Sequence, residues 1–179
     1  QVIEYKPVFL IRFFHVCHSI PDSCGIYFRT PVGTAVHTGD FKFDHTPVDG
    51  QLMDIHKLSE LGNRGVLVLC ADSTNAERPG YTPSEQVVSA SLMQAYGSSP
   101  GRIILATFAS NVSRIQMAID AAIAYKRKVC VFGRSMVNVV GIATELGYLK
   151  VPAGVMIDPD EMGRYRDDQL CILTDGQPG

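Results

Sequence analysis

The stretch RIILATFASNVSRIQMAIDAAIAYKRKVCVFG, residues 102–133, decides the fold class of this 179-residue chain. It begins with a short apolar run at 102–108 and ends with another at 128–133, each with the length and composition of a buried strand. Between them, apolar residues recur at the spacing of one helical face, which predicts a helix over 110–127. The residues on that face are Val112, Ile115, Ala118, Ile119 and Ala122. A strand, a helix and a second strand in this order predict a parallel sheet connected by helices.

The same alternation continues on both sides of this stretch. We predict further strands at 65–71 (GVLVLCA) and 170–175 (LCILTD), and further helices over 82–97 and 135–148. The strands are continuous apolar runs, which is typical of a parallel sheet buried on both faces. We therefore expect an α/β fold in which helices cover the two faces of one sheet.

The first part of the chain has a different texture. Residues 8–38 alternate short apolar runs with turns, and the runs are VFLIRFFHV, CGIYFRT and GTAVHT. The sequence TPVG at 30–33 combines proline and glycine between two of these runs, which predicts a hairpin. We expect an antiparallel sheet in this part.

Composition places the chain among ordinary globular proteins, with 46% hydrophobic and 19% charged residues. No apolar run approaches the roughly 18 residues of a transmembrane helix, so we expect no membrane partner. The net charge of -2 does not indicate strong nonspecific binding to nucleic acid, although a local basic groove is compatible with it. The five cysteines are scattered and form no CxxC, which favours a reduced, cytoplasmic setting. The N-terminus has neither an initiator methionine nor a signal-peptide pattern, so we expect a segment of something longer.

His18 and Asp40 each follow an apolar run directly, at a predicted junction of strand and loop. Rigid scaffolds often hold binding groups at such junctions, and imidazole and carboxylate are the usual zinc ligands of hydrolytic sites. The alternative is that both side chains satisfy backbone donors in local turns, and residue type alone favours this alternative. The remaining histidines are interpreted as structural or surface residues: His15, His37, His45 and His56.

Polar side chains follow three of the predicted strands. They lie at 72–75 (DSTN), at 110–114 (SNVSR) and at 134–135 (RS). Ligands of open α/β sheets bind beyond the carboxyl ends of the strands, and a helix N-terminus can bind phosphate. The alternative is that the hydroxyl and amide groups are plain helix N-caps, and this is favoured for any single one. When three such strand ends lie on neighbouring strands, a polar, phosphate-binding crevice and a set of plain N-caps are equally well supported.

Five short segments follow one another in a fixed order. They are HSIPDS (18–23), TGDFKFD (38–44), ADSTN (71–75), TFASNVSRIQ (107–116) and GRSM (133–136). Together they closely resemble ribonuclease J, a family of the metallo-β-lactamase superfamily in its β-CASP branch, and the resemblance runs from about residue 8 to the end. It implies the C-terminal portion of a metallo-β-lactamase αβ fold at 1–70. A partial, Rossmann-like β-CASP domain with a parallel sheet would follow at 71–179.

The resemblance also implies roles for individual residues. His18 matches a ligand of one zinc ion, and Asp40 matches a catalytic carboxylate that bridges two zinc ions. Asp72 matches a catalytic acid near the scissile phosphate. Eight further residues match stretches that would bind RNA or support the structure: Ser73, Thr74, Asn75, Ser110, Asn111, Arg114, Arg134 and Ser135.

The implied protein is a zinc-dependent ribonuclease that hydrolyses RNA phosphodiesters with two metal ions, as a 5′-to-3′ exonuclease, an endonuclease or both. Its partner would be RNA, and the family tends to form dimers or tetramers. This chain departs from the family pattern, because it contains no HxHxDH motif and no histidine follows His56. A catalytic zinc site needs about three protein ligands. We therefore expect this chain alone to bind zinc weakly and to cleave nothing.

Three other functions compete with this one. A catalytically inactive β-CASP scaffold of an RNA-processing complex is one, but the retained His18 and Asp40 favour an active enzyme. Another metallo-β-lactamase-type hydrolase, acting on a small molecule, is the second, and DSTN and TFASN argue against it. A plain nucleotide-binding α/β domain is the third, and the absence of GxGxxG and GxxxxGK[ST] argues against that.

Overall fold

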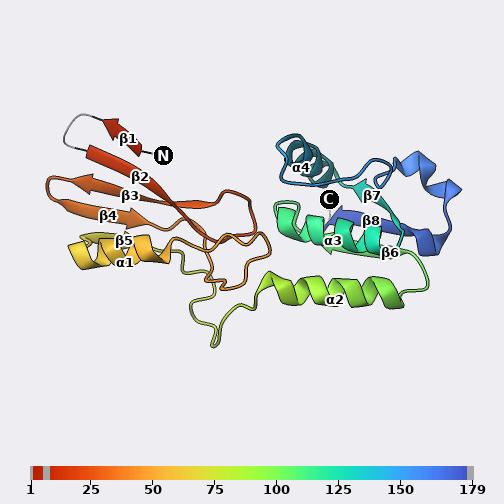
Figure 1. Ribbon diagram of the computed structural model, residues 1–179, viewed down its shortest axis with the longest axis horizontal. Coiled ribbons are helices and arrows are strands. Elements are labelled where there is room, and N and C mark those ends of the chain that lie inside the picture. The colour runs from red at the N-terminus through yellow and green to blue at the C-terminus, as the bar shows by residue number, and fades with distance from the viewer. Residues whose placement is uncertain (1, 6–8, 177–179) are drawn as a thin grey trace. The chain divides into compact units, whose positions relative to one another are not determined.

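Residues 102–133 form the strand, helix and strand that their pattern predicts (Figure 1). In the computed structural model, which describes residues 2–5 and 9–176, these are β6 (Ile103–Thr107), α3 (Val112–Ala124) and β7 (Lys128–Phe132). All five residues of the predicted apolar face of α3 are buried. The predicted α/β class is therefore confirmed.

Contacts divide the chain into two compact units. The first unit comprises residues 1–18 and 22–84, and the second comprises 19–21 and 85–179. By its contacts, the segment that follows β5 groups with the first unit, whereas the family resemblance implies a β-CASP portion that begins near residue 71. At the end of this segment, the hydroxyl of Ser84 donates to the carbonyl oxygen of Thr46 at 2.8 Å.

The first unit is built on a five-stranded sheet. Its strands, in their order across the sheet, are β1 (Val2–Tyr5), β2 (Phe9–His15), β3 (Cys24–Thr30), β4 (Gly33–His37) and β5 (Val68–Cys70). The first four pair in antiparallel fashion, and the predicted hairpin joins β3 to β4. A helix, α1 (Ile55–Arg64), contributes Leu61 to a core that includes Phe14 and Tyr27 of the sheet.

The strand predicted at 65–71 forms, but it lies in a different sheet from the one expected. β5 pairs in parallel with β4 of the first unit, and His37 lies opposite Cys70. It is an edge strand with exposed side chains, and Leu69 is 62% exposed. The prediction of a buried strand in the second sheet is therefore wrong. The physical reason is that α1 forms the crossover that returns the chain parallel to β4.

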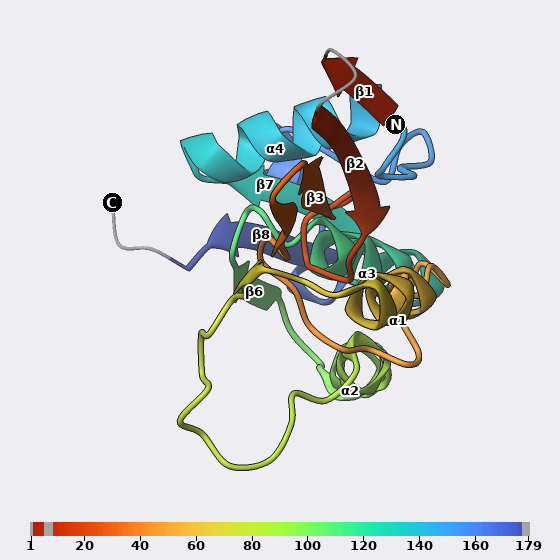
Figure 2. The same ribbon diagram turned by 90° about the vertical axis from the view of Figure 1, so that its left-hand side faces the viewer.

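The second unit is built on a three-stranded parallel sheet with the order β6–β8–β7. Its central strand, β8 (Leu170–Asp175), is the last strand predicted from the sequence. The predicted helices appear as α2 (Glu85–Ser98) and α4 (Arg134–Glu145), and two short 3-10 helices, η1 (Pro159–Arg164) and η2 (Asp167–Gln169), precede β8. Figures 1 and 2 show α2 running beside α3.

Helices cover one face of this sheet rather than both. The buried cluster joins side chains of α2, α3 and α4 to Cys171 and Leu173 of β8. Side chains alternate between the faces along a strand, and Ile104 is 67% exposed. The connection through α3 runs from β6 to β7, and the connection through α4 continues to a bridge between Val129 and Met156. Because both connections run in the same direction and such crossovers are right-handed, they lie on the same face. The prediction that helices cover both faces is therefore wrong for the described residues, although Cys130 and Leu170 of the other face are fully buried.

A buried polar contact in this cluster should make the free energy of unfolding fall at alkaline pH. The hydroxyl of Tyr96 lies 2.8 Å from Sγ of Cys171, and burial raises the pKa of both groups. The unfolded chain therefore loses these protons first, so their stabilising effect is complete below the ordinary thiol pKa of 9.0 and falls as the pH rises above it. We expect Tyr96→Phe to lower the free energy of unfolding at neutral pH by about 1 kcal/mol. Urea unfolding followed by circular dichroism would measure this.

The same variant tests the pH dependence. Because the phenol is absent, Tyr96→Phe should lose less stability than the unchanged chain between neutral pH and about pH 10.5. An equally steep alkaline loss in both proteins would contradict the assignment of this loss to the buried phenol.

Candidate functional site

The turn after β4 is built around Gly39 and leads to Asp40. Gly39 has φ +64, a conformation that favours glycine, and an added Cβ would meet the carbonyl oxygen of Cys24 at 3.0 Å. The backbone N–H of Gly39 donates to Nδ1 of His37 at 3.0 Å. The sequence HTGD thus specifies a tight turn that ends at Asp40.

A short backbone bridge brings the loop of His18 to the loop of Asp40. Cys17 and Lys42 form an isolated antiparallel bridge, in which the N–H of Lys42 donates to the carbonyl oxygen of Cys17 at 2.9 Å. Cys17 is buried and anchors this bridge, whereas the neighbouring His18 is half-buried. As a result, Nε2 of His18 lies 3.9 Å from Oδ2 of Asp40.

The pair of His18 and Asp40 fits two ligands of one metal ion. Their separation of 3.9 Å exceeds only slightly the distance of about 3.4 Å between two ligands of one tetrahedral zinc. Among the described residues, neither side chain accepts a backbone hydrogen bond, so the alternative of local turn stabilisation lacks support. Within residues 2–5 and 9–176 no group of three or more possible ligands occurs, so the described residues place no third ligand beside this pair.

Asp72 lies at the same end of the sheet as this pair. β2, β4 and β5 run in the same direction, and His18, Asp40 and Asp72 follow their carboxyl ends. Oδ1 of Asp72 accepts the backbone N–H of Thr74 at 2.8 Å. This hydrogen bond is the main reason that the pKa of the Asp72 carboxyl lies below its usual value, and the Thr74 hydroxyl, the N–H of Phe41 and the charge of His18 act in the same direction. Asp72 is therefore a carboxylate at neutral pH.

The rest of the loop after β5 is exposed. Ser73, Thr74 and Asn75 present their side chains to solvent beside Asp72. Two backbone hydrogen bonds, from Ala76 to Ser73 and from Arg78 to Asn75, hold the loop in successive turns. The loop therefore offers hydroxyl and amide groups next to the carboxylate.

At the start of α3, one of the predicted RNA-binding residues has a structural partner and another is engaged in an ion pair. Asn111 is the N-cap of α3, and its side chain accepts the backbone N–H of Arg114 at 3.0 Å. The guanidinium of Arg114 donates to both carboxylate oxygens of Glu85, at 3.0 and 2.9 Å. Ser110 is exposed. Asn111 therefore acts as an N-cap, which is the alternative stated for it above.

A carboxylate lies against the start of α4. Arg134 and Ser135 are exposed there, next to Gly133, which has φ +93. A Cβ on Gly133 would lie 2.7 Å from Oδ1 of Asp175, so this position requires glycine. Asp175 is the register partner of Thr107, whose buried hydroxyl has no hydrogen-bond partner among the described residues. An anion that approaches α4 would therefore meet the charge of Asp175.

The three polar strand ends do not belong to one sheet, although the sequence suggested that they would. β6, β8 and β7 end at one edge of the second sheet, so the segments after β6 and β7 share that edge with β8 between them. Asp72 follows β5, which belongs to the sheet of the first unit. The expectation of three neighbouring strand ends is therefore wrong, because β5 pairs with β4.

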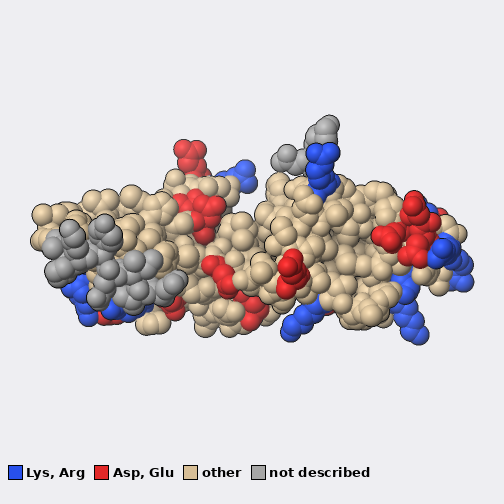
Figure 3. Space-filling view, turned by 90° about the horizontal axis from the view of Figure 1, so that it is seen from above, with Lys and Arg blue, Asp and Glu red and all other residues tan. Residues whose placement is uncertain are grey.

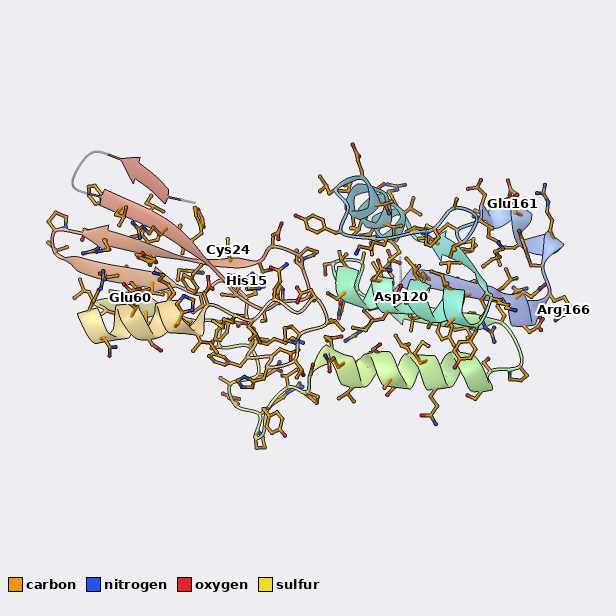
Figure 4. All side chains as sticks on the ribbon, viewed as in Figure 1. His15, Cys24, Glu60, Asp120, Glu161 and Arg166 are labelled. Atoms are coloured by element: carbon orange, nitrogen blue, oxygen red, sulfur yellow. The ribbon has the colours of Figure 1, made fainter. Side chains whose placement is uncertain are left out.

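Charges and the remaining histidines add little to the site. On the face of the molecule in Figure 3, lysine and arginine side chains alternate with acidic ones, and no basic stripe is visible among the coloured residues. His15 lies opposite Cys24 across β2 and β3 (Figure 4), and its backbone N–H donates to Asp54 at 2.9 Å, which is consistent with a structural role. No helix within the described ranges is long and apolar enough to cross a membrane.

Two residues that the sequence reading did not single out contribute to these sites. Thr38 is 4% exposed and accepts the backbone N–H of Asp72. Asp175 lies against Gly133. The sequence signals for these two residues were the hydroxyl of Thr38 directly before Gly39 and the carboxylate of Asp175 at the end of the last strand. Neither signal is sufficient, because the partners of both residues are distant in the sequence.

A comparison with protein families identifies a match within the second unit. Residues 100–179 match the family model described as "Ribonuclease J, beta-CASP domain". Much of the second unit is thus a β-CASP domain, with the parallel sheet that was predicted for it. A crystal structure of a protein of unknown function from Enterococcus faecalis V583 has a similar fold, with a TM-score of 0.67 at 16% identity. That match covers 99% of this chain and 43% of the other.

Curated relatives extend the match to almost the whole chain. Ribonuclease J of Thermus thermophilus is 49% identical over 99% of this chain and 31% of its own length. Ribonuclease J of Helicobacter pylori is 42% identical over 96% of this chain and 25% of its own length. Ribonuclease J2 of Bacillus subtilis is 45% identical over 94% of this chain and 30% of its own length. The chain belongs to the ribonuclease J family, and it spans between a quarter and a third of the length of these relatives.

Proposed function

We propose that this chain is the part of a ribonuclease J-type enzyme that carries two metal ligands, His18 and Asp40, and a catalytic carboxylate, Asp72. The observation that carries the proposal is the convergence of these three side chains at one end of the first sheet. The names of the relatives point to RNA as the substrate. The reaction would be hydrolysis of an RNA phosphodiester, as a 5′-to-3′ exonuclease, an endonuclease or both.

The chemistry follows from the donor types. Metal ions, for which we propose two zinc ions, supply an activated water and stabilise the charge that develops on the phosphate. His18 would ligate through neutral imidazole, so metal binding should weaken at acidic pH. Asp40 exposes 79% of its side chain, so its two carboxylate oxygens are accessible and could serve two ions. Asp72 is held as an anion by Thr74, so it would accept a hydrogen bond and orient its partner near the cleaved bond.

We propose that the RNA is contacted from both units. In the first unit, Ser73, Thr74 and Asn75 offer polar groups beside Asp72. In the second unit, Ser110, Arg134 and Ser135 are exposed at the edge of the sheet. Hydroxyl groups and free amides at helix N-termini bind phosphate oxygens, and at the start of α4 the positive charge of Arg134 would act against the charge of Asp175. Asn111 and Arg114 would support this edge indirectly, through the cap of α3 and the ion pair to Glu85.

The remaining parts of the proposal concern the whole protein. The first unit would be a partial metallo-β-lactamase domain, with the β-CASP portion beginning near residue 71. The enzyme would act in the cytoplasm as a dimer or tetramer. These statements rest on the family membership.

A chimeric enzyme tests the proposed function. The 179 residues would replace the matching segment of the Thermus thermophilus relative, which is 49% identical. We expect the chimera to hydrolyse a 5′-monophosphorylated single-stranded RNA and to lose this activity in EDTA, with recovery on adding zinc. A folded chimera that binds metal and RNA but cleaves nothing would instead favour a catalytically inactive β-CASP scaffold.

The isolated chain should behave differently from the chimera. Two ligands fall short of the roughly three that hold a catalytic zinc. We therefore expect isothermal titration of the purified 179-residue chain to show zinc binding no tighter than about 10 μM, and we expect no RNA cleavage. Tight binding of two zinc ions would contradict this expectation.

A further inference from the structure

We infer that Thr38 is a positioning residue that holds Asp72 in place beside the pair of His18 and Asp40. This inference rests on the proposed function and extends it to a residue that contacts neither metal nor substrate. Thr38 is 4% exposed and lies two residues before Asp40, in the turn that follows β4. Its hydroxyl links this turn to a segment that is 34 residues away in the sequence.

The hydroxyl of Thr38 makes two hydrogen bonds with opposite roles. It donates to the carbonyl oxygen of Gly39 at 2.7 Å, and its oxygen accepts the backbone N–H of Asp72 at 3.1 Å. Donation to Gly39 turns the hydroxyl proton away from Asp72, so a lone pair faces the N–H of Asp72. Because the residue is buried, water does not compete strongly for these bonds.

The backbone of Thr38 strengthens the same connection. Its N–H donates to the carbonyl oxygen of Cys70 at 3.0 Å, directly after the ladder that pairs His37 with Cys70. The three hydrogen bonds form a clamp, which we define as the contacts of Thr38 with Gly39, Cys70 and Asp72. Since β5 has only three residues and exposed side chains, its ladder alone would hold the following loop weakly.

The clamp links the backbone of the two segments that carry the acidic residues Asp40 and Asp72. Asp40 follows the clamp on one side, through Gly39, and Asp72 is bonded to it on the other. A displacement of about 1 Å in a catalytic group is enough to lower a rate by two orders of magnitude. Thr38 would therefore affect the reaction through the placement of Asp72 and not through a contact of its own.

The chain offers conservative substitutions and a matched control. Thr38→Val is close in shape but removes both hydrogen bonds of the hydroxyl, whereas Thr38→Ser keeps the hydroxyl and removes only the methyl group. Thr34→Val makes the same chemical change on β4, four residues earlier, and leaves the clamp intact. These variants separate the hydroxyl from the methyl group and from the strand.

Amide hydrogen exchange of the 15N-labelled, 179-residue chain measures the clamp directly. In Thr38→Val the amide of Asp72 should exchange about fivefold to tenfold faster, because its acceptor is lost. Thr38→Ser and Thr34→Val should stay within about twofold of the unchanged chain. Equal exchange at Asp72 in Thr38→Val and the unchanged chain would overturn the inference. A Thr38→Ser that behaves like Thr38→Val would do so too.

Paramagnetic broadening by Mn²⁺ at millimolar concentration adds a readout that loss of stability alone would not produce. In the unchanged chain, signals of His18, Asp40 and Asp72 should broaden together. In Thr38→Val the broadening of Asp72 should fall relative to that of Asp40, and Thr38→Ser should restore the ratio. A constant ratio in all variants would overturn the inference. If Mn²⁺ broadens neither His18 nor Asp40, the proposed metal pair fails, and the exchange experiment alone then decides whether Thr38 holds Asp72.

Discussion

Arg127→Met is expected to lower the free energy of unfolding of the second unit by about 3 kcal/mol or more. Arg127 is 5% exposed and lies between α3 and β7. Nη1 of its guanidinium donates to the carbonyl oxygens of Gly101 and Leu170, at 2.7 and 3.4 Å. Nη2 donates to those of Ser99 and Tyr96, at 2.6 and 3.4 Å. One side chain therefore binds the end of α2, the start of β6 and the start of β8.

The size of the effect follows from what the variant leaves behind. The last carbonyl groups of a helix have no partner within the helix, and Arg127 supplies donors to that of Tyr96 in α2 and to that of Ser99, directly after α2. Each buried acceptor that loses its partner costs about 1 to 3 kcal/mol, and charged donors are at the upper end of this range. Removing the charge recovers part of its desolvation cost, so we expect about 3 kcal/mol rather than the full sum.

The matched control is Arg102→Met. Arg102 forms an ion pair with Asp167 at 2.6 Å, but both side chains are largely exposed, so its loss should cost less than about 1 kcal/mol. Arg127→Lys keeps the charge without the fork of donors and should fall between the two. Thermal unfolding by circular dichroism, with amide exchange of α3 to report on the second unit, would compare all three. A loss in Arg127→Met no larger than in Arg102→Met would contradict the assigned role.

Local patterns were sufficient for most of the second unit. Periodicity predicts the helix α3 and the strands β6, β7 and β8, because the spacing of apolar residues within each short segment already indicates which side chains are buried. Which faces of the sheet the helices cover could not be predicted from such local patterns. It depends on the direction in which the connection through α4 continues, and this is a property of the topology and not of any single window.

β5 shows why part of the candidate site could not be predicted. The run GVLVLCA has the composition of a buried strand, but its partner is chosen by the crossover through α1. That choice moves Asp72 from the parallel sheet of the second unit to the sheet that carries His18 and Asp40. The roles of these three residues came from the family resemblance, whereas the clamp of Thr38 required contacts across 34 residues.

Asp40→Ala should lower the rate of RNA hydrolysis by the chimera with the Thermus thermophilus relative by at least about 100-fold. The carboxylate lies 3.9 Å from Nε2 of His18 and would be a ligand of the metal ions. Metal ions contribute several kcal/mol of charge stabilisation in the transition state, and about 2.7 kcal/mol already corresponds to 100-fold. We expect the loss in kcat, with less zinc bound per chain, because the change removes a ligand and leaves the RNA contacts in place. Single-turnover cleavage assays and elemental analysis of the dialysed protein would measure both.

The matched control for this prediction is Asp49→Ala. Asp49 is an exposed aspartate of the same unit, and its carboxylate accepts only the local N–H of Gln51, at 3.0 Å, among its described hydrogen bonds. This variant should retain the zinc content and the rate of the chimera within about twofold, because surface changes of this kind rarely exceed about 0.5 kcal/mol. If Asp40→Ala kept both the zinc content and the rate of the chimera, Asp40 would not be a metal ligand. If it lost the rate but kept the zinc, the carboxylate would act on the substrate or on water, and the bridging role would be wrong.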